Sequence, residues 1–403
     1  METEEKKGKS IIFYISLIGF FGIFTTTISK NPVLPYLVNS LGAGDQILGL
    51  ISAISPFAGI VFSFPVGVLA DKIGKRLMLL IAAFIFLLAP LLYLLVTNAW
   101  WLIPVRFFHG MATAILGPLA ATIIAGAYDS NRGEKLGVYS SATLIGRTLA
   151  PLAGGALIAF FAMHGELFSY RMVYVAAFIM AIPVVIAAFL VKTGDAAVKK
   201  SISLSEFFIS LKYIIGNKMI LATALVDLST YFSFGIFETF APGYLKSAGY
   251  KPEIVGLIFS LQILSIALTK PLFGRLADKI DKRVQIAAGL LVLGLSVAAL
   301  PFVSSFVLVL AVSLLFGLAM SFSTVATSAY VADVAKKEQL GASMGALSSI
   351  MDVGHSTGPL LAGTVIVALH SSKAGFLSGF VLTLLVVLLF VYFAYSKKIE
   401  RAR

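Results

Sequence analysis

The sequence predicts an all-α membrane protein with 12 transmembrane helices in two pseudo-symmetric six-helix bundles. Three observations predict this fold: an unusually apolar composition, twelve apolar runs long enough to cross a bilayer, and an internal repeat. Of the 403 residues, 59% are hydrophobic and only 12% are charged. A soluble domain has roughly 25% charged residues, so much of the surface of this chain is expected to face lipid.

Each of the twelve runs approaches or exceeds the roughly 20 apolar residues that a spanning helix needs. Backbone polar groups in lipid must be hydrogen-bonded within the chain, so each run is expected to be helical. The first run is too long for a signal-peptide core and no small-residue cleavage site follows it. The runs cover 11–38, 46–69, 76–96, 100–127, 135–162, 170–191, 219–245, 253–275, 283–300, 304–331, 340–368 and 373–396.

The basic residues predict the orientation. With the N-terminus inside, 23 of the 31 lysine and arginine residues fall in cytoplasmic segments, four in outer segments and four within the runs. This asymmetry predicts a multi-pass protein of the cell membrane with both termini in the cytoplasm. The net charge of +12 then reflects topology and contact with the lipid bilayer, so no nucleic-acid partner is expected.

The chain divides at its longest polar stretch between runs. Residues 192–218 are predicted to be a cytoplasmic linker between an N-terminal bundle at 1–191 and a C-terminal bundle at 219–403. Segment 67–76 recurs 207 residues later as 274–283, and segment 146–155 recurs 208 residues later as 354–363. Such a duplication is typical of transporters whose two halves rock around a site near the middle of the membrane.

The loop between the second and third runs carries the most specific motif, Gly67-Val-Leu-Ala-Asp71-Lys-Ile-Gly74-Lys75-Arg76. Physically, a glycine lets two helices approach, an aspartate can cap or pair at a helix end, and basic residues hold the cytoplasmic face. The loop resembles the signature loop of the major facilitator superfamily, and the resemblance covers essentially the whole chain. In that family the loop helps to latch the outward-facing state, whereas the alternative is a generic positive-inside loop. The implied conformational gate comprises Gly67, Asp71, Gly74, Lys75, Arg76, Gly274, Asp278 and Arg283.

Two further motifs resemble the family. In the fourth run, Arg106 is followed by His109 and Gly110, as in a motif that has glutamine at the histidine position. The resemblance makes Arg106 part of proton coupling, and the alternatives are a structural salt bridge or a snorkelling arginine. The fifth run resembles the antiporter motif of the drug–proton branch, which favours export; the alternative is ordinary packing of small residues. The predicted hinge and packing residues are Gly146, Pro151, Gly154, Gly155, Gly354, Gly358 and Pro359.

Ionisable side chains within the runs are the remaining signal. Each costs roughly 2.5–3.5 kcal/mol near the bilayer centre, so they are expected to face a wet cavity or one another. Asp227 and Glu238 are eleven residues apart on one helix face, and Asp352 and His355 are one turn apart. The predicted residues for proton coupling or substrate binding are Asp352, Glu238, Asp227, Arg106, Arg147, Lys30, His355 and His109.

Within this set, Asp352 is the first candidate for the proton carrier, because its position is nearest the middle of its run. Glu238 and Asp227 follow. The alternative for each carboxylate is a permanently ionised partner of a basic residue, including a pair between Lys30 and Glu238. For both histidines the alternative is a hydrogen-bonded interior side chain. Several aromatic residues, including Tyr231 and Phe234, could contact an amphipathic substrate, although aromatic residues in spans more often face lipid.

No pattern indicates an enzyme. The chain has no cysteine, which excludes disulfides and thiol chemistry. The segment Gly8-Lys9-Ser10 fails as a phosphate-binding loop, because the required earlier glycine is Thr3. We therefore expect no catalytic residues, no metal and no cofactor, with a proton gradient as the energy source.

The sequence thus predicts a monomeric, proton-coupled exporter of a small amphipathic molecule that works by alternating access and resembles multidrug antiporters. Lys30 lies in the first run, where exporters of cationic drugs often have an acidic residue, so a neutral, zwitterionic or anionic substrate is favoured. One alternative is a proton-coupled importer or facilitator of a sugar, organic acid or other nutrient. Another is a membrane receptor or scaffold that transports nothing. The substrate itself is not identified.

Overall fold

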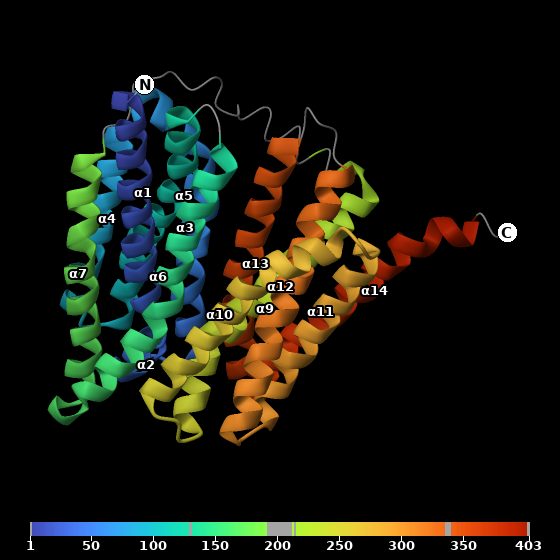
Figure 1. Cartoon of the computed structure of the whole chain (residues 1–403). Helices are drawn as coiled ribbons and strands as arrows, with labels where there is room; N and C mark the ends of the chain where they lie inside the picture. The colour runs from blue at the N-terminus through green and yellow to red at the C-terminus, as the bar shows by residue number, and fades with distance from the viewer. Residues whose placement is uncertain (1, 129–130, 192–211, 213–214, 335–339, 401–403) are drawn as a thin grey trace. The chain divides into compact units, whose positions relative to one another are not determined.

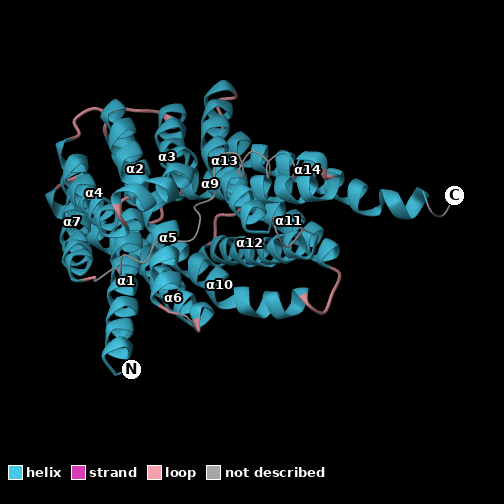
Figure 2. Ribbon diagram, turned by 90° about the horizontal axis from the view of Figure 1, so that it is seen from above, coloured by secondary structure: helices cyan, strands magenta, loops and turns pink. Residues whose placement is uncertain are grey.

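The computed structural model describes residues 2–128, 131–191, 212, 215–334 and 340–400 (Figure 1). This part of the chain is helical, and no strand occurs in it (Figure 2). Twelve of its helices have 18 residues or more. The helices are α1 (Glu2–Ile28), α2 (Val33–Ser40), α3 (Asp45–Ile73), α4 (Lys75–Leu95), α5 (Leu102–Ala127), α6 (Arg132–Phe160), α7 (Glu166–Leu190), α9 (Lys218–Ser247), α10 (Pro252–Ala277), α11 (Lys282–Ala299), α12 (Phe306–Val334), α13 (Leu340–Ala368) and α14 (Ser372–Glu400).

The predicted all-α membrane fold is confirmed. Eleven segments of the described residues are long and apolar enough to cross a membrane, and α13 is the long helix that is not among them. The predicted linker at 192–218 lies mostly outside the described residues.

The first predicted run is not one helix. It breaks after Ile28, and α2 resumes at Val33. Pro32 has no amide hydrogen, so it cannot donate the hydrogen bond that would continue α1. Lys30 and Asn31 therefore lie in a short irregular segment between α1 and α2.

Two compact units make up the chain. Unit 1 comprises Met1–Gly44, Phe57–Ser203 and Gly249–Ser260, and unit 2 comprises Asp45–Pro56, Leu204–Ala248 and Leu261–Arg403. Two segments are thus exchanged: the start of α3 belongs to unit 2, and the start of α10 belongs to unit 1.

The core of unit 1 is formed by apolar faces of α1, α4, α5 and α7. Ile15, Phe86, Leu116 and Val184 are completely or almost completely buried in it. Glycine allows the helices to pack closely, since a Cβ at Gly146 of α6 would overlap the carbonyl oxygen of Phe20 on α1. In Figure 1, α1, α4, α6 and α7 accordingly run side by side.

Unit 2 is built by the same means. Val226, Ile286, Leu290 and Phe390 bring α9, α11 and α14 together in an apolar cluster. Small residues again bring backbones into contact along α9 and α13, which positions the polar side chains of these two helices described below.

Candidate functional site

Close packing of α13 on α9 defines the frame of the candidate site in unit 2. A Cβ at Gly354 would overlap the carbonyl oxygen of Leu228, and one at Gly358 would overlap that of Phe232. On the opposite helix, a Cβ at Gly235 would lie 2.8 Å from the carbonyl oxygen of His355. These contacts fix the two helices at backbone distance, so side chains beside the seam are held at defined separations.

The central feature of this seam is a histidine–glutamate pair. His355 Nε2 lies 3.0 Å from Glu238 Oε2, and the two side chains are only 19% and 11% exposed. The rings of Phe234 and Tyr231 have their centroids 5.3 Å and 6.3 Å from that of His355. The pair can hold or release a proton, while the aromatic rings beside it offer an apolar contact surface.

Asp227 lies on the same face of α9 as Glu238, because eleven residues are close to three whole turns. Its side chain is 1% exposed. Thr327 of α12 donates a hydrogen bond of 2.7 Å to Asp227 Oδ1, and Lys270 of α10 acts on the carboxylate electrostatically. Asp227 is therefore held inside unit 2 by a neutral donor and a more distant cation.

Asp352 is placed differently from the other two carboxylates. It is half-buried on α13, three residues before His355. Within the described part of the chain it has no hydrogen bond and no ion pair. It is thus the one of the three carboxyl groups in the α9–α13 region that no described side chain holds in place.

Unit 1 contains a buried basic cluster rather than an acidic one. Arg106 and His109 on α5 are each 1% exposed. His109 Nε2 lies 3.3 Å from Thr26 Oγ1 of α1. The rings of Tyr93 and Tyr174 stack at 4.5 Å, and the Arg106 guanidinium acts electrostatically on both phenols. Burial of Arg106 means that its side chain does not snorkel to the surface of the unit.

Two further predicted basic residues belong to other segments of unit 1. Lys30 is half-buried in the segment between α1 and α2, and Arg147 is exposed on α6. The described part of the chain contains no group of three or more His, Asp or Glu side chains that could hold a metal ion.

The predicted gate loop and its repeat differ at one position. Gly74 precedes α4 with a φ of 90°, a backbone conformation that favours glycine. In the repeat this position is Asp281, which has a φ of −62° and caps α11 by accepting a 2.9 Å hydrogen bond from Arg283 N. The surroundings of Gly67 and the side chain of Asp71 are not among the described parts of the chain. Lys75 Nζ reaches α5, where it lies 3.4 Å from a Cβ built at Gly126.

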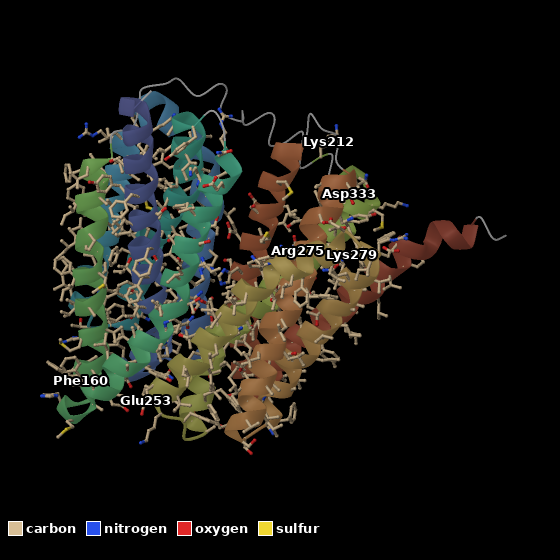
Figure 3. All side chains as sticks on the ribbon, in the orientation of Figure 1. Phe160, Lys212, Glu253, Arg275, Lys279 and Asp333 are labelled. Atoms are coloured by element: carbon tan, nitrogen blue, oxygen red, sulfur yellow. The ribbon has the colours of Figure 1, made fainter. Side chains whose placement is uncertain are left out.

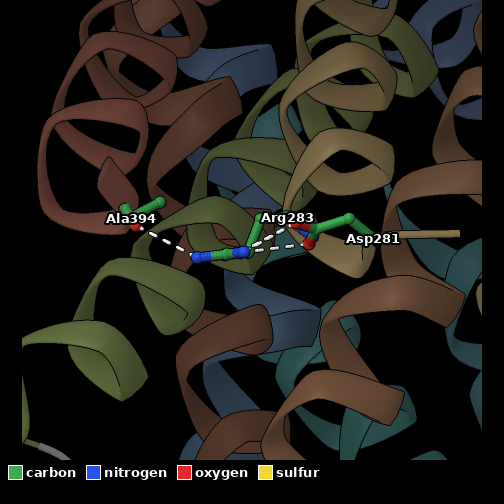
Figure 4. Close-up of polar contacts among 3 residues, drawn as sticks. All are labelled: Asp281, Arg283 and Ala394. Atoms are coloured by element: carbon green, nitrogen blue, oxygen red, sulfur yellow. Dashed lines mark hydrogen bonds and ion pairs between the residues drawn. The ribbon is translucent and has the colours of Figure 1, made fainter. Parts of the chain in front are cut away.

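Arg283 makes the densest polar contacts of the repeat. Its guanidinium donates to both carboxylate oxygens of Asp281, with a shortest distance of 2.7 Å, and to the carbonyl oxygen of Ala394 at 3.2 Å (Figure 4). Nearby, Lys282 Nζ pairs with Asp333 at 3.0 Å. Figure 3 shows Asp333 at the same end of unit 2 as Lys279. The predicted gate residue Asp278 is exposed. The ion-pair partner of Arg283 is Asp281, which was not among the predicted gate residues.

The start of α3 is fastened to α13 by what we term the α3–α13 clasp, formed by Gly49, Ala53, Ser356, Pro359 and Gly363 within unit 2. A Cβ at Gly49 would overlap the carbonyl oxygen of Pro359, and one at Gly363 would lie 2.6 Å from that of Asp45. Ser356 Oγ donates a hydrogen bond of 2.9 Å to the carbonyl oxygen of Ala53.

An equivalent contact, the α6–α10 clasp, occurs within unit 1. A Cβ at Gly256 would overlap the carbonyl oxygen of Pro151, and one at Gly155 would overlap that of Pro252. Ser260 Oγ accepts a hydrogen bond of 3.0 Å from Leu152 N. The predicted packing residues Pro151, Gly155 and Pro359 therefore all lie in one of the two clasps. Gly154 contacts another segment, where a Cβ would lie 3.2 Å from the carbonyl oxygen of Asn31.

Comparisons with known proteins cover nearly the whole chain. A family model described as Major Facilitator Superfamily matches residues 15–253 and 223–403. The multi-drug resistance efflux pump PmrA of Streptococcus pneumoniae is 27% identical over 276 residues, which is 65% of this chain and 67% of the pump. The multidrug resistance protein MdtG of Enterobacter lignolyticus is 26% identical over 389 residues, which is 92% of this chain and 89% of that protein. A crystal structure of the nucleoside transporter NupG, in mutant form, has the same fold, with a TM-score of 0.80 at 14% identity over 96% of this chain and 99% of NupG.

Proposed function

The chain belongs to the major facilitator superfamily, and we propose that this multi-pass membrane transporter exports a small amphipathic molecule in exchange for protons by alternating access. Export is supported by the names of the relatives PmrA and MdtG, which are multidrug proteins. The antiporter-like sequence of α6, which packs through Gly146 on α1, supports the same direction.

The observation that carries proton coupling is the pair between Glu238 and His355 in the α9–α13 seam. A carboxylate and an imidazole at 3.0 Å share one binding region for a proton. Adding a proton neutralises the carboxylate and weakens its attraction for a polar or cationic ligand group. Protonation and substrate binding would then compete, which is the thermodynamic requirement for exchange.

Asp352 is the second proton candidate in the same region. It lies three residues before His355 on α13 and has no partner among the described side chains. A proton bound there would neutralise an otherwise unpaired charge inside the span. One proton crossing 100 mV releases about 2.3 kcal/mol, enough for roughly a fifty-fold gradient of a neutral solute.

For the substrate we propose a molecule with an apolar part that contacts Phe234 and Tyr231, the rings beside His355. The distribution of basic residues supports a cell-membrane protein with both termini in the cytoplasm. We further propose that the protein works as a monomer with the proton gradient as its energy source. The fold does not decide the substrate class, because a nucleoside transporter shares it.

The proposal is tested with the purified full-length protein in proteoliposomes, with ethidium as a cationic probe and norfloxacin as a zwitterionic one. An acidic vesicle lumen should drive uptake of a probe into the vesicles. This uptake is carried by those transporter molecules whose cytoplasmic face points out of the vesicle. Glu238→Gln should reduce this uptake at least tenfold, because the neutral amide cannot carry a proton. Glu134→Gln is the matched control, since Glu134 is an exposed carboxylate paired with Lys135.

Import is the competing outcome. The export proposal is wrong if neither probe moves under any gradient while a nucleoside, sugar or organic acid from a matched panel is taken up in the same direction as protons. The nutrient alternative then holds. If Glu238→Gln and His355→Gln both transport at the wild-type rate with the same dependence on the pH gradient, the pair is not the coupling site.

A further inference from the structure

The Arg106 cluster of unit 1 contains a buried charge that the described side chains do not neutralise. Arg106 is 1% exposed, and its Nε and Nη1 are buried without a hydrogen-bond partner. None of the ion pairs formed by the described residues involves this guanidinium. Burying a charged group without compensation costs several kcal/mol, so an additional group is needed to balance it.

Neighbouring polar atoms are also without partners. His109 Nδ1 and the hydroxyl oxygen of Tyr93 are buried and have no hydrogen-bond partner. The rings of Tyr93 and His109 have their centroids 6.0 Å apart. Arg106 acts electrostatically on both residues, and its guanidinium also interacts with the Tyr93 hydroxyl at the margin of hydrogen-bond range, short of a full hydrogen bond. Four polar atoms without a full hydrogen bond thus lie where α4 and α5 meet. Three of them are nitrogen atoms of Arg106 and His109, and the fourth is the Tyr93 hydroxyl oxygen.

The hydrogen bonds of His109 show what the imidazole can do. Thr26 Oγ1 donates to the carbonyl oxygen of Gly22 at 3.1 Å, so it can only accept from His109 Nε2, which lies 3.3 Å away. A neutral His109 with its proton on Nε2 has a lone pair on Nδ1. An anion beside Arg106 would be repelled by this lone pair but attracted by a protonated imidazolium.

We propose that Arg106, His109 and Tyr93 form a binding site for a monovalent anionic group, and that His109 takes up one proton when the anion binds. Arg106 supplies the permanent charge and two N–H donors, His109 Nδ1 gains a donor with its proton, and the Tyr93 hydroxyl is a further donor. Besides His109, the titratable or charged groups shown to act within the cluster are Arg106, Tyr93 and Tyr174.

Two sources could supply the anionic group: a free ion such as chloride, or a carboxylate of the transported molecule. The second source rests on the proposed function, and it would make the substrate an acid. The first source does not depend on that function. Because the cluster atoms are buried, either ligand enters only when the surrounding side chains move.

The test measures thermal stabilisation of the purified full-length protein in detergent at pH 6, 7 and 8. One arm compares sodium chloride with sodium sulfate at equal ionic strength. The other, in sulfate buffer, compares indole-3-acetate with its methyl ester. We expect saturable stabilisation by chloride or by the acid but not the ester, with affinity falling about tenfold per pH unit because one proton is taken up with each anion.

Three substitutions test which side chains bind the anion and the proton, and a fourth serves as the control. Arg106→Met should abolish the stabilisation, whereas Arg106→Lys should weaken it while keeping the charge. His109→Gln should retain anion binding but lose its pH dependence. Arg132→Met is the matched control, because Arg132 is an exposed arginine of the same unit and belongs to none of the predicted sites, and it should behave as the wild type.

The outcomes separate this inference from the proposed function. Stabilisation by chloride identifies a free-ion site, and stabilisation by the acid alone identifies a substrate carboxylate site. If neither ligand stabilises the wild type at any pH, or if Arg106→Met keeps the effect, the anion site is refuted even if ethidium exchange persists. If anion binding follows the expected pattern but no probe is exchanged for protons, the site stands and the export proposal fails.

Discussion

Replacing Gly49 with alanine tests whether the start of α3 must separate from α13 during transport. The added Cβ would overlap the carbonyl oxygen of Pro359 and lie 3.1 Å from its carbonyl carbon and 3.5 Å from Gly363 Cα. All three obstacles are backbone atoms, so the two helices must move apart rather than a side chain rotate away. Such overpacking costs roughly 1–3 kcal/mol, which shifts a two-state equilibrium roughly 5–150-fold.

The assay is maleimide labelling of a single introduced cysteine. The chain has no cysteine of its own, so no other thiol reacts. Ser52 lies on the same segment of α3 and is 2% exposed, so the thiol introduced by Ser52→Cys reports whether the α3–α13 clasp is closed. We expect maleimide to label this thiol slowly in the Ser52→Cys protein. Adding Gly49→Ala should raise the labelling rate roughly 5–150-fold, because the closed conformation is populated less.

Gly137→Ala in the Ser52→Cys background is the control, since a Cβ at Gly137 of α6 would meet nothing within 4 Å. Gly256→Ala should loosen the α6–α10 clasp in the same way, because its Cβ would overlap the carbonyl oxygen of Pro151. If Gly49→Ala labels no faster than Gly137→Ala while both proteins unfold at similar temperatures, the backbone contact does not limit opening and the reasoning is refuted.

Three further predictions concern polar groups of unit 2. Asp281→Ala removes the cap of α11 and the ion-pair partner of Arg283. It should destabilise the protein by about 1 kcal/mol, which is measured as a lower unfolding temperature. An unchanged unfolding temperature would mean that the cap contributes nothing to stability. Thr327→Val removes the hydrogen-bond donor to Asp227 and should cost roughly 1–3 kcal/mol in the same measurement, whereas Thr327→Ser should cost less. Asp352→Asn should change the free energy of unfolding by less than about 0.5 kcal/mol, because Asp352 has no partner to lose among the described residues. It should nevertheless flatten the dependence of transport on the pH gradient; an unaltered dependence would exclude Asp352 as the proton carrier.

The helices could be predicted because the bilayer imposes one rule on every span. Apolar runs of sufficient length must be helical, and the boundaries of most helices follow from where the runs stop. The break between α1 and α2 could not be predicted by hydropathy, which scores Val33 and Leu34 as a continuation of the run. The deciding feature is the missing amide hydrogen of Pro32, a local property that average hydropathy does not contain.

The candidate site was only partly predictable. Helical periodicity places Asp227 with Glu238, and Asp352 with His355, because residues on one helix are related by a fixed rotation. Periodicity does not say which helices touch, so it offers no reason to choose His355 as the neighbour of Glu238. That pairing depends on the approach of α13 to α9, which Gly354 makes possible by leaving room for a carbonyl oxygen of α9.

The residues that form the two clasps are related to one another by the internal repeat of the sequence. Gly49 and Gly256 are related by the 207-residue offset, and Pro151 and Pro359 by the 208-residue offset. Each glycine packs on the proline from the other repeat, Gly49 on Pro359 and Gly256 on Pro151. The repeat predicts which residues are equivalent, but a sequence cannot show that equivalent residues exchange partners. Because the two contacts are equivalent in both sequence and geometry, a substitution that loosens one clasp should have a counterpart of similar size in the other.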